Sequence, residues 1–67
     1  MRISYDKLWK LLIDNRMKRQ DLIRAAEISA NTVTKLGKNE TVSLEVIMKI
    51  CKVFHCDIGD IMEIIEE

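Results

Sequence analysis

Residues 18–37 read KRQDLIRAAEISANTVTKLG and contain the most informative pattern in the chain. The first nine of them carry two apolar residues and two alanines among charged ones, which is typical of a short helix of about two turns. Ser29 is a good N-cap for a second short helix, in which Val33 and Leu36 follow at i, i+3 spacing. Residues 27–29 leave room only for a tight connection. The stretch therefore predicts two short helices joined by a tight turn.

Three further helices are predicted on either side of this pair. The first begins after Ser4 and ends near Asn15, and its apolar stripe consists of Tyr5, Leu8, Leu11 and Leu12. The fourth is capped by Ser43, and its stripe consists of Leu44, Ile47, Met48, Cys51 and Phe54. The fifth is capped by Asp57, and its stripe consists of Ile58, Ile61, Met62 and Ile65. We therefore expect an all-α fold, a compact five-helix bundle that forms a single domain over residues 1–67.

The formal net charge is zero, but the charges are unevenly distributed along the chain. Residues 16–38 hold six basic residues against two acidic ones, a local charge of +4, whereas residues 57–67 hold five acidic residues and no basic one. Such segregation fits a molecule that presents one face to an anion and another to water or to a partner.

Several function classes find no support in the sequence. No apolar stretch approaches the roughly 18 residues of a membrane span, and we expect a cytoplasmic protein without a membrane partner. Cys51 and Cys56 form no disulfide framework and are expected to be reduced. Together with His55 they offer only three metal ligands, so core packing explains them better than a metal site. Without a nucleophile elbow or a carboxylate pair in an apolar cleft, we expect no enzyme, no cofactor and no small-molecule ligand.

Two short helices joined in this way form the unit that presents its second helix to the major groove of DNA. The groove is about 12 Å wide and admits one helix. The residues available to face it are Ser29, Asn31, Thr32, Thr34 and Lys35. Asparagine can pair with adenine, and lysine can donate to guanine or to phosphate. Taken alone, such a face is more typical of a solvated surface helix, and it is the spacing of the flanking residues that favours contact with double-stranded DNA.

At these positions the chain resembles the phage-repressor-like helix-turn-helix regulators, also called Cro/repressor or XRE-like regulators. The resemblance rests on MKRQDL at 17–22, ISANTVTKL at 28–36, SLEVIMKIC at 43–51 and DIGDI at 57–61. It implies a lambda-repressor-like DNA-binding domain with the helix-turn-helix at helices 2 and 3, acting as a sequence-specific transcriptional regulator of the repressor type. Base contacts are implied for Ala30, Asn31 and Lys35. Phosphate contacts are implied for Lys18, Arg19, Ser29, Thr32 and Lys38.

Some positions of the helix pair differ from what this family often has. Glu27 stands where glycine is frequent in the turn, which would cost about 1 to 2 kcal/mol if the backbone is left-handed. Ile23 replaces a small residue, and Arg19 replaces a glutamine. Gly37 and Asn39 are expected to close the second helix of the pair, because both residue types tolerate the left-handed conformation.

Apolar residues near the end of the sequence predict self-association. Met62, Ile64 and Ile65 exceed what a short final helix needs for one buried face, and exposed apolar patches mark association sites. We expect a two-fold homodimer through this C-terminal helix. The helices that begin near Ser29 in the two subunits would then enter the major groove about 34 Å apart.

An alternative function from another class is a helical protein-interaction module that has kept the fold without binding DNA. Salt separates the two, because phosphate contacts make duplex affinity fall as salt rises.

Overall fold

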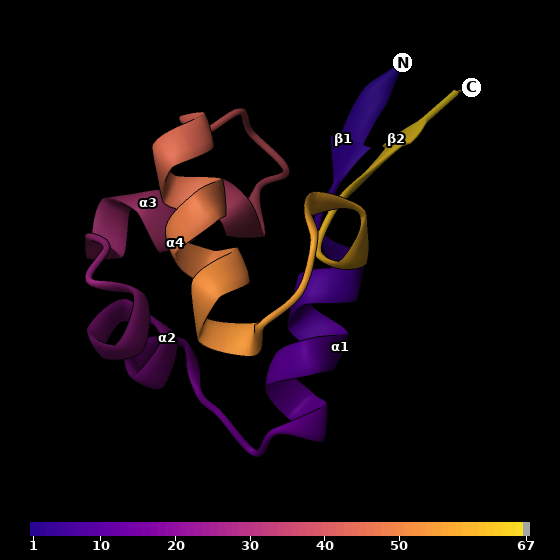
Figure 1. Ribbon diagram of the computed structural model, residues 1–67. Coiled ribbons are helices and arrows are strands. Elements are labelled where there is room, and N and C mark those ends of the chain that lie inside the picture. Colours follow the sequence, from indigo (N-terminus) through magenta and orange to yellow (C-terminus); the bar gives the residue numbers. More distant parts are fainter. Residues whose placement is uncertain (67) are drawn as a thin grey trace.

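The computed structural model describes residues 1–66, in which four α-helices surround a shared core and a two-stranded sheet lies at one side (Figure 1). The elements in chain order are β1 (Arg2–Ser4), α1 (Asp6–Asp14), α2 (Arg19–Ala26), α3 (Ala30–Gly37), α4 (Leu44–Phe54), the 3₁₀ turn η1 (Ile58–Asp60) and β2 (Glu63–Ile65). α4 packs against α2 and η1, and α2 packs against α3. The mostly helical fold and the first four predicted helices are confirmed.

The predicted fifth helix is wrong. The chain after Asp57 forms only the short turn η1 and then strand β2. This strand pairs antiparallel with β1, with Ile3 opposite Ile64 and Ser4 opposite Glu63. β-branched residues pack well on a pleated surface, and pairing with β1 satisfies backbone groups that a helix would have satisfied internally. The described residues therefore form four α-helices with a small sheet, and not a five-helix bundle.

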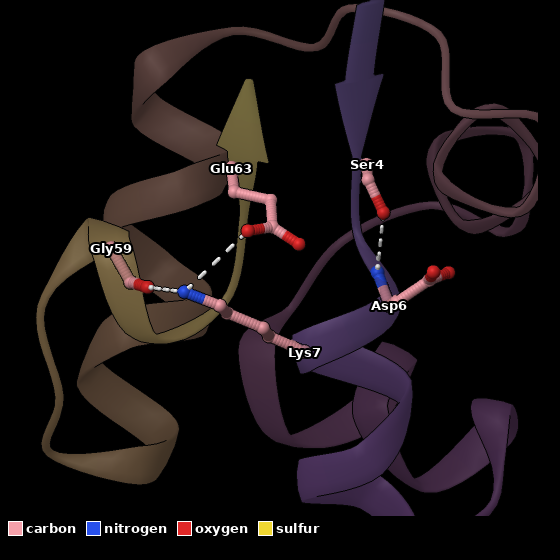
Figure 2. A network of polar contacts seen from close by, with 5 residues as sticks. All are labelled: Ser4, Asp6, Lys7, Gly59 and Glu63. Carbon is pink, nitrogen blue, oxygen red and sulfur yellow. Dashed lines mark hydrogen bonds and ion pairs between the residues drawn. The ribbon is translucent and has the colours of Figure 1, made fainter. Parts of the chain in front are cut away.

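The sheet holds the two ends of the chain side by side (Figure 1). Figure 2 shows the polar contacts beside it: Lys7 Nζ donates to the carbonyl oxygen of Gly59 at 3.1 Å and lies 3.9 Å from the Glu63 carboxylate. Ser4 Oγ accepts the backbone N–H of Asp6 at 3.3 Å, so this serine supports the first turn of α1 from within β1. α1 is thereby fixed to both η1 and the sheet.

The core gathers buried side chains from every helix. The buried apolar residues are Tyr5, Leu8, Leu12, Leu22, Ala26, Ile28, Val33, Leu36, Ile47, Ile50 and Ile61. The stripe predicted for α1 is among them, with Leu11 half-buried. The stripe predicted for α4 is wrong in part, because Leu44 and Met48 are 69% and 70% exposed. The buried side of α4 is centred on Ile47 and Ile50, while Cys51 and Phe54 are half-buried beside it.

The turn between α2 and α3 depends on a left-handed residue. Glu27 is the C-cap of α2, with φ 55° and ψ 48°, and Ile28 after it is buried. A side chain in this conformation is disfavoured by about 1 to 2 kcal/mol because its Cβ crowds the backbone. The turn therefore forms although Glu27 makes its left-handed conformation energetically unfavourable.

Replacing Glu27 with glycine should stabilise the protein. Relief of the left-handed strain exceeds the added entropy of the unfolded chain, so we expect a net gain of about 0.5 to 1 kcal/mol. The unfolding midpoint should rise by about 4 to 8 °C per kcal/mol in a domain of this size, which thermal denaturation followed by circular dichroism measures. Glu27→Ala is the matched control, because alanine keeps its Cβ. An equal rise in both variants would contradict the role of backbone strain.

Candidate nucleic-acid interface

Helices α2 and α3 pack against each other, and their inner faces are buried in the common core. Leu22 of α2 and Leu36 of α3 are fully buried, and Val33 is 3% exposed. Ser29 caps α3 as predicted, and its Oγ accepts the backbone N–H of Thr32 at 3.1 Å. The remaining faces of the pair are left to solvent.

The three residues implied as base-reading lie together on the outer side of α3. Ala30 is its first residue, and Asn31 and Lys35 follow, four residues apart, so that they share one face of the helix. All three are exposed. Neither the Asn31 amide nor the Lys35 ammonium has a hydrogen-bond partner or ion pair among the contacts within residues 1–66. Both groups are therefore available to an external ligand.

Other polar residues of α3 are partly used within the helix. Ser29 Oγ and Thr32 Oγ1 lie 2.9 Å apart and share one hydrogen bond, so one of the two hydroxyl protons remains for an outside acceptor such as phosphate. Thr34 differs, because its hydroxyl donates to the carbonyl oxygen of Ala30 at 3.1 Å. On the exposed face of α3, Ser29, Thr32 and Thr34 therefore make hydrogen bonds within the helix, whereas Asn31 and Lys35 remain open to a ligand.

Exposed basic side chains occur in and beside α2 and at the end of α3. Lys18 is the N-cap of α2, Arg19 is its first residue, and Lys38 is the C-cap of α3; all three are exposed. Arg16 and Arg24 are exposed as well, but Arg24 is engaged by Asp21 in an ion pair of 2.8 Å. The local positive charge seen in the sequence therefore belongs to side chains that water, or an anion, can reach.

Asp21 organises the start of α2. Its Oδ2 accepts the backbone N–H of Lys18 at 2.8 Å, and its Oδ1 accepts from Arg24 Nη2 at 2.8 Å. The hydrogen bond from the Lys18 backbone, followed by the contact with Arg24, lowers the pKa of the Asp21 carboxyl below its ordinary value. The charged form is therefore favoured in the folded state.

This lowered pKa predicts a dependence of stability on pH. Because the folded pKa lies below the unfolded one, the contribution of Asp21 is complete above the unfolded pKa of about 3.9 and is lost as pH falls through the folded pKa. The difference in thermal midpoint between the wild type and Asp21→Asn should narrow as pH is lowered from 7 toward about 2. A difference that stays constant over this range would contradict the assignment.

Tyr5 fixes the loop between α3 and α4. Its Oη donates to the carbonyl oxygen of Glu40 at 2.8 Å, and its backbone N–H donates to Asn39 Oδ1 at 3.2 Å. Burial raises the pKa of the Tyr5 hydroxyl, which keeps it a proton donor. No local pattern predicts these contacts, because they join residues more than 30 positions apart.

The end of α3 differs from the prediction at Gly37. Asn39 has a positive φ of 56°, as expected, but Gly37 has no positive φ and belongs to the helix. A Cβ at Gly37 would lie 3.1 Å from Nη1 of Arg19, whose guanidinium also lies 4.5 Å from the ring centroid of Trp9. Glycine at position 37 therefore allows the Arg19 side chain to approach α3 closely. Trp9 contacts Arg19, and the sequence pattern did not predict its place beside the candidate interface.

The residues predicted for self-association lie on and beside β2. Ile64 is 62% exposed, whereas Met62 and Ile65 are half-buried. The helix on which the predicted dimer was built is absent, so any contact through these residues would use strand β2.

A separate open hollow of about 430 Å³ lies beside α4 and η1, and its apolar lining includes Leu44 and Met48.

Cys51 and Cys56 are free thiols at the same hollow. Burial, followed by the neighbouring Cys56, raises the pKa of the Cys51 thiol, so it stays protonated. No cluster of metal-ligating side chains occurs in residues 1–66. Within the same residues, no helix has the length and apolar character needed to cross a membrane.

Comparison with known proteins gives two matches. A family model described as the Cro/C1-type HTH DNA-binding domain matches residues 7–67. Among solved structures, the chain is similar to the transcriptional regulator VanUg in its crystal form II, with 55% sequence identity and a TM-score of 0.92. That match covers 98% of this chain and 88% of the other. No curated protein matches the chain.

Proposed function

Since the chain belongs to the Cro/C1-type helix-turn-helix DNA-binding domains and is a DNA-binding transcriptional regulator, we propose that it recognises specific duplex sequences by placing α3 in the major groove. The observation that carries the proposal is the division of α3 into two faces. Val33 and Leu36 are buried, while Asn31 and Lys35 are exposed on a common face without partners in the described residues. A helix fixed by its inner face can present its outer face to base edges.

We assign the residues of this interface as follows. Asn31 reads adenine and Lys35 reads guanine, while Ala30 contacts base edges as a small apolar group. Phosphate contacts come from both helices and fix the register without reading sequence. They are assigned to Lys18, Arg19, Ser29, Thr32 and Lys38. We expect residues 1–67 to act as one domain that binds DNA and catalyses no reaction. We further expect the protein to repress genes, to work in the cytoplasm and to need no cofactor.

Selection of bound duplexes from a random pool tests this proposal. We expect a defined motif to be enriched, because bidentate contacts to base edges discriminate by about 1 to 3 kcal/mol at each position. The Asn31→Ala variant, selected in parallel, should lose preference at one position of the motif. A pool that remains random after several rounds with the wild-type protein would contradict sequence-specific recognition.

We further propose that the regulator binds as a two-fold homodimer through the surface of Met62, Ile64 and Ile65. The support is Ile64, a large apolar side chain left 62% exposed on β2. Enriched duplexes should then contain two inverted half-sites with centres about 34 Å apart. Sedimentation at high micromolar concentration should show a dimer for the wild type and for Met48→Lys, and a monomer for Ile64→Lys. Wild-type monomer at that concentration would contradict the dimer, and a monomer caused by Met48→Lys would move the interface to α4.

A further inference from the structure

Arg19 lies at a junction of three helices. It is the first residue of α2, its guanidinium carbon is 4.5 Å from the ring centroid of Trp9 on α1, and its Nη1 lies 3.1 Å from the position that a Cβ would take at Gly37 on α3. Trp9 is half-buried and packs against the core, so its ring is held in place. The guanidinium is thus stacked on a fixed surface and passes closely over the end of the recognition helix.

The stacked guanidinium keeps its donors free. An arginine on an aromatic face uses its planar surface for the cation–π contact, while its N–H groups point outward in the plane. Within residues 1–66, no carboxylate is paired with Arg19, and its side chain is exposed. These donors form the fork that binds the oxygens of a phosphate in a bidentate manner.

Gly37 explains how the guanidinium reaches this place. A Cβ at this position would lie 3.1 Å from Nη1, 3.5 Å from Nη2 and 3.6 Å from Cζ of Arg19. The glycine is helical, so its conformation does not require the absence of a side chain. What requires it is the space that Arg19 occupies against α3.

We propose that Trp9 is a positioning residue for DNA binding: its ring holds the Arg19 guanidinium against the end of α3, oriented for a phosphate of the bound duplex. The proposal rests on the proposed function, because it assigns a support to one of its phosphate contacts. Without the Trp9 ring, Arg19 would still carry its charge, but DNA binding would have to offset the entropy lost when its side chain becomes ordered. The contribution of Trp9 to affinity is therefore made through Arg19 alone.

A double-mutant cycle tests this coupling. Duplex affinity is measured by fluorescence anisotropy for the wild type, Trp9→Leu, Arg19→Ala and the double variant, with folding checked by circular dichroism. Trp9→Leu should weaken binding about two- to five-fold when Arg19 is present, and should change it little in the Arg19→Ala background. Trp9→Phe keeps an aromatic face and should restore most of the affinity.

A control cycle uses Asn31, which lies six residues before Gly37, about 9 Å along α3. The effects of Trp9→Leu and Asn31→Ala should add, because the two sites share no contact. Equal weakening by Trp9→Leu with and without Arg19 would show a structural role only and would overturn the proposal. If the wild type binds no duplex, the proposed function fails and the positioning role fails with it.

A second readout needs no DNA. Trp9 is the only tryptophan in the chain, so its emission reports the stacked guanidinium directly. Arg19→Ala should change the intensity and wavelength of this emission in the folded, free protein, while Arg24→Ala should leave both unchanged. Identical spectra for the wild type and Arg19→Ala would overturn the stacking on which the proposal depends.

Discussion

Replacing Asn31 with alanine should weaken binding to the preferred duplex by about 1 to 3 kcal/mol and leave binding to unrelated duplexes nearly unchanged. The amide lies on the exposed face of α3 and has no partner within the described residues, so the change removes a donor and an acceptor without disturbing the fold. Lys35→Ala should act in the same direction. Competition between the selected duplex and a scrambled one, followed by anisotropy, measures this loss of discrimination.

Two controls separate base reading from other effects. Thr34→Ala removes a hydroxyl that already donates to the Ala30 carbonyl within α3, so it should change duplex affinity little. Arg19→Ala removes a proposed phosphate contact and should weaken binding to every duplex by a similar factor. If Asn31→Ala also weakened every duplex equally, its assignment as a base-reading residue would be wrong.

Leu36→Ala should have the largest effect on folding. Leu36 is fully buried where α3 meets the core, and truncation of such a leucine costs about 2 to 5 kcal/mol through lost burial and the cavity left behind. A chain of 67 residues has only about 3 to 10 kcal/mol of stability in total. Urea denaturation should therefore show a free energy of unfolding that is lower by about 2 to 5 kcal/mol, a large part of the total.

Met48→Ala is the matched control for this experiment. Met48 is also a large apolar residue in a helix, but its side chain is 70% exposed, so its removal should change stability by no more than about 0.5 kcal/mol. Similar losses in the two variants would contradict the assignment of Leu36 to the core and of Met48 to the surface.

The helix-turn-helix could be predicted from sequence because its determinants are local. Ser29 and Ser43 both accept the backbone N–H three residues later, as an N-cap does, and Val33 and Leu36 are both buried. The possible strain at Glu27 came from the resemblance, because the family often has glycine at that position, and Glu27 is indeed left-handed. Local capping and periodicity therefore sufficed to predict α2 and α3, and the resemblance to a known family suggested their function.

The end of the chain could not be predicted in the same way. Ile58, Ile61, Met62 and Ile65 have helical spacing, but the pairing of β2 with a strand at the other end of the sequence decides their conformation. In α4, all but three residues are apolar, so periodicity alone could not choose between the face with Ile47 and the face with Met48. Non-local packing made both choices.

The same limit applies to the surroundings of the interface. The contact of Arg19 with Trp9 and Gly37 joins three helices, and no local pattern announces it. Gly37 has the residue type expected for a helix end, yet it is used for a close approach by Arg19. The position of Tyr5 under the α3–α4 loop is likewise a property of the assembled fold.

The salt dependence of duplex affinity distinguishes a face that binds DNA from one that binds another protein. If Lys18, Arg19 and Lys38 reach phosphates in both subunits of the proposed dimer, about six phosphates are neutralised, and the logarithm of affinity should fall against the logarithm of salt concentration with a slope near −5. Arg19→Ala removes one of these cations in each subunit and should reduce that slope by about two. A helical module that binds other proteins would give no duplex binding to titrate. Absence of binding at low salt, or an affinity that salt does not change, would contradict the assignment of this face to DNA.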